Sequence, residues 1–410
     1  MNLLLPTKKR NGREGLQDYR NRKGYEGWRL ARDQEPRKTV QAIVDSGLRG
    51  RGGAAFPAGR KWQLLSQNAT KTRFLVVNGG EDEPGSFKDR YLMEHYPHLV
   101  LEGAFIAAFA LDVGQIFLYV NESFDASQRS LKEALEELAT SGLLDGLEIK
   151  LDFFSAPQDY VAGEDTAVLE VLEGKPPIPR KKPPYPVESG YQGCPTVVHN
   201  VETLANVPLI VREGPESYRN IGTPDSPGTM LFYLNEEFDH PGVYELPFGT
   251  PLRHLVEELE GGLKGGKGIK AILPGGPSTA FLPGELLDVA LDPEALVEAG
   301  SILGCGNVRL IPEGVCMVEV TLEIAEFFAR ESCGKCPQCS METNAFVTIL
   351  KKIQAGEADP AMLQQIEKVA IFSRGKGDCG LIHMAATPVL SALKYFLADF
   401  EAHLDGKGCL

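Results

Sequence analysis

Apolar and polar residues alternate along the first half of the chain in a pattern that predicts strands and helices in turn. Residues 74–77 and 115–120 are apolar runs of strand length, and residues 99–111 between them form an apolar stretch of helical length. From 126 to 140 leucine and alanine recur at helical spacing, and from 147 to 153 apolar and polar residues alternate as in a half-buried strand. This order predicts an α/β sheet that binds ligands at its strand ends.

A second pattern begins after residues 222–228, a stretch rich in glycine and proline. Residues 230–234, 242–246 and 269–273 read as strands, and residues 251–259 read as a short helix. Together they predict a small α+β domain.

From about residue 315 to the C-terminus the pattern is helical. Apolar residues recur at helical spacing in four stretches, at 320–328, 346–353, 362–369 and 390–400. Thr387 followed by Pro388 predicts the start of the fourth helix, with threonine as N-cap and proline at the first helical position. Four amphipathic helices with short connections predict a bundle.

Length and charge limit the kinds of protein that this chain can be. A chain of 410 residues is expected to form two or three domains. Its net charge of −14 argues against binding to nucleic acid, because phosphates would be repelled. No uninterrupted apolar run reaches the roughly 18 residues of a membrane-spanning helix, and residues 1–15 lack the apolar core of a signal sequence. We therefore expect a cytoplasmic protein without direct membrane insertion, or one on the cytoplasmic face of a larger assembly.

The cysteines at the end of the chain predict a metal centre. Cys333, Cys336 and Cys339 form a C-x-x-C-x-x-C run, and Cys379 follows after two predicted helices that would return the chain to its starting point. Three thiolates from one loop and a fourth from elsewhere are typical of a 4Fe-4S cluster. Zinc is the alternative metal, although zinc sites more often pair two C-x-x-C knuckles, and plain core cysteines without a metal are the remaining alternative.

A glycine-rich segment precedes the first strand. Gly50, Gly52 and Gly53 would let backbone N–H groups approach a phosphate or a flat ring closely, and Lys61 could pair with a phosphate. The segment is not G-x-G-x-x-G, so the ordinary dinucleotide fingerprint is absent. A plain turn is the alternative.

Acidic turns follow two of the predicted strands. Residues 78–85 come directly after the strand at 74–77, and residues 163–166 form a second such turn that leads into a helix. Their carboxylates could accept hydrogen bonds from ribose hydroxyls; the alternatives are a loop that caps a helix, with Ser86 as N-cap, or a divalent metal site. The amide of Asn200 could bond the edge of a heterocycle.

Together these segments resemble the NADH-binding flavoprotein subunit of respiratory complex I and the diaphorase subunits of NAD-linked hydrogenases, formate dehydrogenases and aldehyde dehydrogenases. The matching motifs are GRGGAAFPAGRKW at 50–62, NGGEDEPGSFKDR at 78–90, GEDTA at 163–167, KPPYP at 182–186, NVET at 200–203 and ESCGKCPQC at 331–339. They span most of the chain.

The resemblance implies three domains: a Rossmann-like α/β domain at 1–221 that binds flavin and NADH, a small β-grasp-like (SLBB-type) domain at 222–312 and a four-helix iron–sulfur domain at 313–410. Implied around the FMN are Gly50, Arg51, Gly52, Lys61, Asn78, Tyr160, Gly163, Glu164 and Asn200. Implied on the nicotinamide-nucleotide side are Phe56, Glu83, Asp165, Lys182 and Tyr185. Further cofactor contacts are expected from Gly53, Glu81 and Thr203, and the cluster from Cys333, Cys336, Cys339 and Cys379.

The chain departs from the family pattern at Gly80, where the family has aspartate, and at Ala55, where it has glycine. Asp165 stands for a glutamate and Leu64 for a frequent phenylalanine. These departures indicate a divergent branch and leave FAD as an alternative to FMN.

The implied function is that of an oxidoreductase component which exchanges hydride between NAD(H) and flavin, and single electrons with the cluster and with other iron–sulfur subunits. Either direction of electron flow is chemically allowed, and NADPH is an alternative to NADH. The rival hypothesis is a structural subunit that keeps the fold without binding nucleotide.

Overall fold

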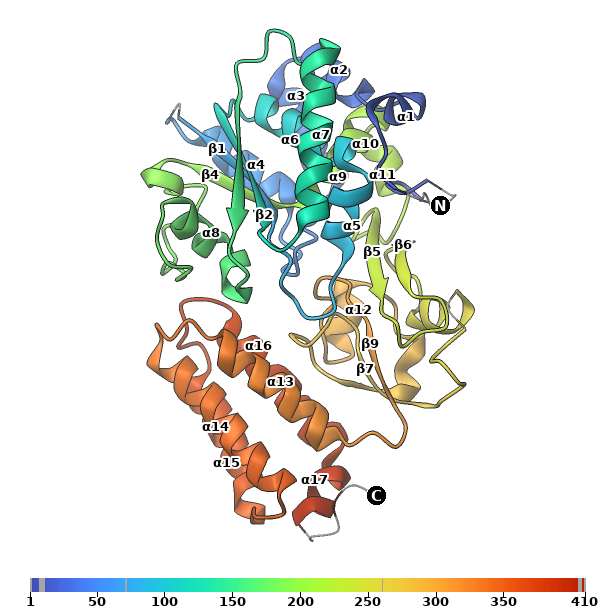
Figure 1. Ribbon diagram of the computed structural model, residues 1–410, viewed down its shortest axis with the longest axis vertical. Helices are drawn as coiled ribbons and strands as arrows, with labels where there is room; N and C mark the ends of the chain where they lie inside the picture. Colours follow the sequence, from blue (N-terminus) through green and yellow to red (C-terminus); the bar gives the residue numbers. More distant parts are fainter. Residues whose placement is uncertain (1, 7–11, 71, 260, 405–407, 409–410) are drawn as a thin grey trace.

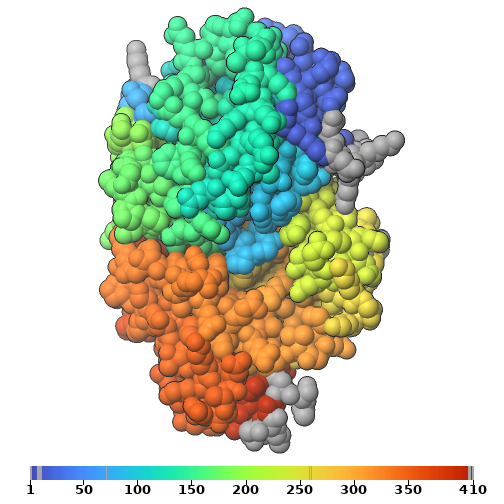
Figure 2. Space-filling model, viewed as in Figure 1, coloured from blue at the N-terminus to red at the C-terminus, as the bar shows by residue number. Residues whose placement is uncertain are grey.

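A computed structural model of the chain describes residues 2–6, 12–70, 72–259, 261–404 and 408. An α/β part, a smaller part with antiparallel strands and a C-terminal helical part follow one another along the chain (Figure 1). The helical part, in orange, lies directly against the two others (Figure 2). The mixed α/β class is confirmed, whereas the domain boundaries at 221 and 312 and the β-grasp-like assignment stay predictions.

Four parallel strands form the sheet of the α/β part in the order β3-β2-β1-β4. They span Phe74–Gly79 (β1), Gln115–Asn121 (β2), Lys150–Ala156 (β3) and Thr196–Asn200 (β4). The first two were predicted, and the third begins three residues later than expected. The central strand β1 pairs with β2 on one side and with β4 on the other, so the carboxyl ends of β1 and β4 lie side by side.

Strand β4 was not predicted from the sequence. Its five residues follow a proline and include only two apolar residues, Val197 and Val198, which is too short a run to distinguish a strand from a buried loop or helix by periodicity. It becomes a strand because β1 offers it an unpaired edge, on which Asn200 comes to lie opposite Asn78.

Helices cover both faces of the sheet, because alternate residues of a strand point to opposite sides. Leu75 and Val77 of β1 pack into one apolar core, and Phe74 and Val76 pack into another. The first core is lined by Leu16–Asn21 (α1), Glu26–Arg32 (α2), Pro36–Ser46 (α3), Ala58–Gln67 (α4), Lys88–His95 (α5), Pro97–Ala110 (α6), Asp125–Ser141 (α7), Val201–Ala205 (α9), Val207–Glu213 (α10) and Pro215–Arg219 (α11). The second is lined by Asp165–Leu172 (α8), which follows the short 3-10 helix η1, Tyr160–Gly163.

The smaller part contains two antiparallel sheets around a core of its own. Its elements are Thr229–Leu234 (β5), Gly242–Pro247 (β6), His254–Glu258 (η3), Ile269–Leu273 (β7), Leu282–Pro283 (β8), Gly284–Asp288 (η4), Pro293–Glu298 (α12) and Arg309–Pro312 (β9). The three strands expected from the sequence are confirmed, and the expected short helix at 251–259 is present as a helical segment at 252–258 that is mostly the π-helix η3.

The C-terminal part is helical, as predicted, but its described residues form five helices and not the expected four, because the predicted fourth helix at 390–400 is broken after Tyr395. Its helices are Met317–Glu331 (α13), Pro337–Gln354 (α14), Pro360–Ser373 (α15), Leu381–Tyr395 (α16) and Leu397–Leu404 (α17). They pack around one apolar core that also takes in Val161 of η1, so this core continues into the α/β part.

The predicted start of the fourth helix at Thr387 is wrong. Helix α16 contains Pro388 in its interior, and the chain bends by 81° between α16 and α17. The hydroxyl of Thr387 donates to the carbonyl of His383 instead of capping a helix. The residues before the proline, such as Ile382, are buried in the core, and this burial outweighs the backbone hydrogen bond that the proline removes.

Among the residues that the structure describes, no single helix is long and apolar enough to cross a membrane. The bent pair of α16 and α17 meets that test only when joined, by length and composition alone.

Candidate functional site

Four segments that the sequence predicted as ligand-binding meet at the carboxyl edge of the parallel sheet. Asn78 at the end of β1 lies opposite Asn200 at the end of β4. The side chain of Asn78 donates a 2.9 Å hydrogen bond to the carbonyl of Gly163 in η1. A Cβ atom on Gly52 would lie 3.2 Å from Cβ of Asn200, which places the glycine-rich loop against the same edge. This edge is where α/β sheets bind ligands.

The glycine-rich loop is closed at its base and open at its tip. The amide of Gly50 donates to the carbonyl of Phe56, and Arg49 pairs with Pro57 as an isolated β-bridge. Gly53 has a φ of +106°, and a Cβ atom there would meet nothing within 4 Å. Open space beside a positive φ leaves the backbone accessible to a ligand, as a phosphate- or ring-binding loop requires.

Ala55 has a φ of +50° in this loop, at the position where the family pattern has glycine. A left-handed conformation costs an L-residue about 1 kcal/mol, whereas glycine adopts it freely. We expect Ala55→Gly to raise the free energy of unfolding by about 0.5 kcal/mol, since part of the gain is offset by the greater freedom of glycine in the unfolded chain. Chemical denaturation measures this change, and a loss of stability would contradict the backbone assignment.

Arg51 and Thr203 anchor the loop with their side chains. The Arg51 guanidinium is 1% exposed and donates to the carbonyl of Thr229 and the hydroxyl of Tyr218. The backbone N–H of Arg51 donates to the Thr203 hydroxyl at 2.9 Å. Both side chains are therefore bonded within the protein, so the glycine-rich loop can offer a ligand its backbone at this point.

Glu81 and Asn200 are also engaged within the protein. Glu81 accepts hydrogen bonds from the backbone N–H groups of the first three residues of α5 and from the Ser86 hydroxyl. The alternative of a helix-capping loop therefore holds for this segment, with Glu81 in the place that Ser86 was expected to take. The carbonyl oxygen of the Asn200 side chain caps α9, and its amide nitrogen donates to Asp89 at 2.6 Å.

Two lysines and two carboxylates form a charged cluster beside η1. Lys182 lies 2.6 Å from Glu164 and 2.9 Å from Asp165. Burial tends to lower the pKa of Lys182, but the carboxylates of Asp165 and Glu164 outweigh it and raise that pKa. Lys61 donates to the carbonyl of Val198, and burial lowers the pKa of its ammonium. The cluster offers cations and hydrogen-bond acceptors close together, as recognition of a nucleotide requires.

Phe56 and Tyr185 present aromatic rings at the surface. Phe56 is 45% exposed at the end of the glycine-rich loop, and Tyr185 is 53% exposed after Lys182 in the proline-rich segment. Large aromatic side chains gain free energy when a flat partner covers them. Both positions therefore fit the nucleotide side to which the sequence assigned them.

Residues of the smaller part also hold the loop after β1, and the sequence analysis did not find them. Glu83 accepts from the backbone N–H of Ser278 at 3.1 Å, and Asn307 donates to the carbonyl of Pro84 at 2.6 Å. Burial raises the pKa of Glu83, although hydrogen bonds from Tyr160 and Ser278 act in the opposite direction. Nothing in the local pattern around Ser278 or Asn307 signals this contact, because it joins residues about 200 positions apart.

Asp82 is held at the same loop in an acidic setting. Its Oδ1 accepts a hydrogen bond from the Asn121 side chain. Burial, and then the charges of Asp159, Glu331 and Glu81, raise the pKa of Asp82 to about 7. Protonated Asp82 therefore stabilises the folded chain; this contribution is complete below the unfolded pKa of about 3.9 and is lost as the pH rises through about 7.

Asp82→Asn keeps an acceptor for Asn121 but cannot ionise. We expect the free energy of unfolding of this variant, relative to wild type, to increase by about 1 kcal/mol between pH 5 and pH 8, after allowance for solvent screening. Denaturation at both pH values measures the difference. An equal difference at the two pH values would show that Asp82 is ionised throughout.

The four predicted cysteine ligands lie around one pocket. Cys333, Cys336, Cys339 and Cys379 line it together, and the hairpin of α14 and α15 returns the chain as expected. The backbone N–H of Asp378 donates to the sulfur of Cys336 at 3.4 Å, and Lys335 bridges Asp378 and the carbonyl of Pro179. Hydrogen bonds of this kind fix cluster ligands and tune their electronics.

Four cysteines around one pocket could hold either a 4Fe-4S cluster or a zinc ion. Within the described ranges, no three His, Cys, Asp or Glu side chains converge as they would on one metal ion. A zinc ion draws its thiolates to about 2.3 Å from a common point, whereas a 4Fe-4S cube holds four thiolates at its corners.

The short helix η1 connects the two centres. Its last residue, Gly163, bonds Asn78 at the sheet edge, whereas Val161 lines the cysteine pocket. Tyr160, its first residue, packs its ring against Phe327 and Phe328 of α13. The predicted flavin side and the predicted cluster side are thus separated by a single turn of backbone.

Comparison with known proteins bears on both centres. Residues 43–209 match the family model of the Nuo51 FMN-binding domain, and residues 319–403 match that of the NADH-ubiquinone oxidoreductase-F iron–sulfur binding region. The first match covers the glycine-rich loop, the sheet and the charged cluster. The second covers all four cysteines, and it confirms the prediction of iron–sulfur over zinc.

Individual relatives match over nearly the whole chain. The F subunit of the NADH-quinone oxidoreductase of Streptomyces coelicolor is 40% identical over 96% of this chain and 89% of its own length. The F subunit of the Escherichia coli enzyme is 39% identical over 94% and 89%. The NAD+-reducing [NiFe]-hydrogenase, as a solved structure in the air-oxidised state, is similar with a TM-score of 0.87 and 35% identity, covering 96% of this chain and 67% of that one. The chain therefore belongs to the family of NADH-binding flavoprotein subunits, with an FMN-binding domain and a 4Fe-4S binding region, to which the F subunits of NADH-quinone oxidoreductases belong.

Proposed function

We propose that this subunit exchanges electrons between NAD(H), bound at the carboxyl edge of the parallel sheet, and partner subunits that dock near the cysteine pocket. The observation that carries the proposal is helix η1, one turn of backbone that reaches Asn78 at one end and lines the cysteine pocket with Val161. When bound, FMN supplies the conversion between two-electron hydride transfer and one-electron transfer.

The chain's own residues orient and hold the reactants in this proposal. The backbone of Gly50, Gly52 and Gly53 approaches the flavin nucleotide, because Gly53 leaves open space that a side chain would fill. Asn78, Gly163 and Asn200 line the sheet edge beside it. Tyr160 and Glu83 close this region against the helical and smaller parts.

The engaged side chains act indirectly in the proposal. Arg51, Thr203 and Glu81 hold the loops in place, and Asn200 contributes mainly through its backbone, since its side chain is already bonded at both ends. Lys61 supplies a positive charge at the end of β4.

We place the nicotinamide nucleotide over the surface formed by Phe56, Tyr185 and the charged cluster. The exposed rings can stack on a flat base, and the cluster can bind ribose and phosphate groups. Lys182 neutralises Glu164 and Asp165, which would otherwise repel an anionic dinucleotide.

We propose that Cys333, Cys336, Cys339 and Cys379 hold the 4Fe-4S cluster and that the next electron carrier is an iron–sulfur subunit, in a complex related to the quinone oxidoreductases or to the NAD-linked hydrogenases. Cys333 is exposed, and Ile371 and Phe372 expose large apolar side chains at the C-terminal end of α15. Exposed apolar groups beside a redox centre suit a protein interface. A cytoplasmic location is part of this proposal.

Anaerobic purification followed by visible spectroscopy tests the proposal. The protein should carry FMN, or take it up when it is supplied, and NADH should bleach the flavin absorbance. A chain that binds no flavin, or whose flavin NADH does not bleach, would support the rival hypothesis of a structural subunit. Co-purifying subunits, identified by mass spectrometry, name the partner.

A further inference from the structure

The side chain of Lys88 is buried between two carboxylates of α5 and α9. Lys88 is 1% exposed, and its Nζ lies 2.9 Å from Oδ1 of Asp89 and 3.0 Å from Oε2 of Glu202. Burial alone would lower the pKa of this ammonium, but Asp89 and Glu202 outweigh it and raise that pKa. In such a network each charge depends on the others, because removing one leaves an uncompensated charge in the interior.

Asp89 connects this ion pair to the end of β4. Its Oδ2 accepts the hydrogen bond from the Asn200 amide at 2.6 Å, and its Oδ1 accepts the backbone N–H of Glu202 at 3.3 Å. The Asn200 amide nitrogen therefore faces Asp89, and its oxygen is turned toward the first N–H groups of α9. Asp89 thus fixes which way Asn200 points, and Asn200 is the residue against which Gly52 packs.

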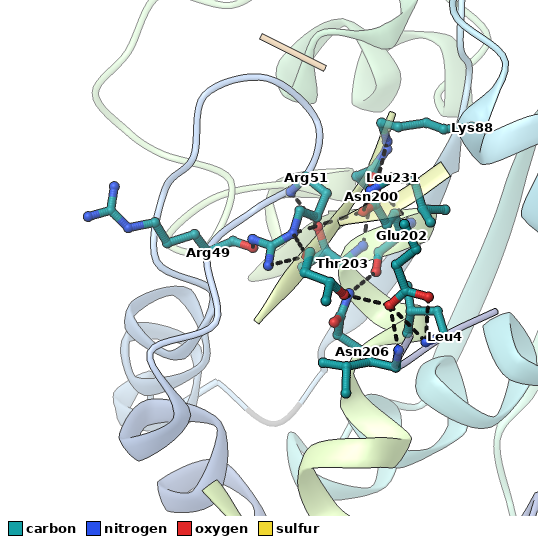
Figure 3. A network of polar contacts seen from close by, with 12 residues as sticks. Leu4, Arg49, Arg51, Lys88, Asn200, Glu202, Thr203, Asn206 and Leu231 are labelled. Atoms are coloured by element: carbon teal, nitrogen blue, oxygen red, sulfur yellow. Dashed lines mark hydrogen bonds and ion pairs between the residues drawn. The ribbon is translucent and has the colours of Figure 1, made fainter. Parts of the chain in front are cut away.

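Glu202 connects the same ion pair to the glycine-rich loop. Its Oε1 accepts the backbone N–H of Leu231 at 2.8 Å and lies 4.0 Å from Nε of Arg51 (Figure 3). The next residue along α9, Thr203, accepts the backbone N–H of Arg51. A displacement of Glu202 would therefore disturb both contacts that hold Arg51 of the glycine-rich loop, the one from its side chain to Glu202 and the one from its backbone to Thr203.

The loop after β1 is also joined to this network, through Glu81. Glu81 accepts the backbone N–H groups of Lys88, Asp89 and Arg90, so the start of α5 is fixed to this loop. Three of the segments at the sheet edge, which are the glycine-rich loop, the loop after β1 and the end of β4, are joined through Lys88 and its two carboxylates.

We propose that Lys88, Asp89 and Glu202 are positioning residues that hold these three segments in the geometry that binds FMN. The inference rests on the proposed function and extends it to residues that have no contact with the flavin assigned to them. Because Lys88 compensates both carboxylates, its loss alone should weaken FMN binding more than its loss together with the charge of Glu202.

The test compares Lys88→Met, Glu202→Gln and the double variant in the full chain loaded with its cluster. After removal of the flavin, FMN is titrated back, and its dissociation constant is read from flavin fluorescence. Each single variant should raise this constant roughly tenfold or more, and the double variant should raise it no more than Lys88→Met does, because Glu202→Gln removes one of the two carboxylates that Lys88→Met leaves unpaired. The flavin midpoint potential of the reloaded single variants should also shift, whereas that of the cluster should not.

Two further variants keep the test decisive. Asp89→Asn is isosteric and keeps an acceptor for Asn200, so it should fold and still weaken FMN binding by a smaller factor. Lys270→Met breaks a matched pair, in which Lys270 lies 2.5 Å from Asp399 between the smaller and helical parts, and it should leave FMN binding unchanged.

The outcomes separate the inference from the function on which it rests. If wild type binds FMN and the Lys88, Asp89 and Glu202 variants bind it equally well while only their melting temperatures fall, the residues are merely structural and the inference is overturned. If wild type itself binds no FMN, the proposed function fails and the inference fails with it.

Discussion

Replacing Cys336 by alanine should leave the reduction of flavin by NADH intact and abolish electron transfer to any acceptor beyond the cluster. Cys336 is one of four thiols around the pocket, and its sulfur also accepts the N–H of Asp378. Loss of an outer partner of a metal ligand lowers metal affinity or activity roughly 10–100-fold, and loss of a direct ligand should lower it further. The α/β part has two apolar cores of its own in addition to the one it shares with the helical part, so its fold should persist.

The measurement is stopped-flow flavin bleaching by NADH beside steady-state reduction of a one-electron acceptor that requires the cluster. Cys194→Ala is the matched control, because Cys194 is a free cysteine outside the pocket. It should change neither rate. If flavin bleaching in folded Cys336→Ala slows as much as onward transfer does, the proposed division between the two centres is wrong.

Replacing Lys182 by methionine should raise the KM for NADH roughly tenfold or more and leave the FMN content unchanged. A factor of ten corresponds to about 1.4 kcal/mol of binding free energy. The methionine fills similar space but leaves Glu164 and Asp165 without the cation that lies 2.6 and 2.9 Å away. Two uncompensated carboxylates would then face an anionic dinucleotide. Initial rates against NADH concentration, with an acceptor that takes electrons directly from the flavin, measure the effect.

Lys175→Met is the control for the loss of charge in the same segment. Lys175 pairs with Glu173 at 2.6 Å, but it is 53% exposed, and pairs at the surface contribute little. Its KM for NADH should stay within about twofold of wild type, as for a typical surface pair. An unchanged KM in Lys182→Met would show that the nucleotide does not bind at this cluster and that Lys182 has only a structural role.

The sequence predicts long elements well and fails where packing overrides a local signal. The apolar runs of β1 and β2 and the helical periodicity of α7 were strong enough to be read directly. Thr387 and Pro388 gave a strong helix-start signal, yet the buried residues before them continue α16. Strand β4 depends on an edge that only the folded sheet provides.

In the candidate site, too, local motifs were predictable and long-range contacts were not. Motifs located the glycine-rich loop, the sheet edge and the cysteines, because each requires particular residue types at fixed spacing. They did not reveal that the side chains of Arg51 and Glu81 point into the protein, since side-chain direction depends on partners distant in sequence. They also missed Lys88 and Ser278, whose importance lies entirely in such partners.

The central claim is that NAD(H) and the iron–sulfur cluster communicate through this one subunit. An anaerobic titration of the purified chain, loaded with FMN and cluster, tests it most directly when NADH is added and electron paramagnetic resonance is recorded. We predict that the signal of the reduced cluster appears with NADH in wild type and is absent in Cys336→Ala, while the flavin bleaches in both. A wild-type chain with an intact cluster and bleached flavin, but without a cluster signal at any NADH concentration, would contradict the account.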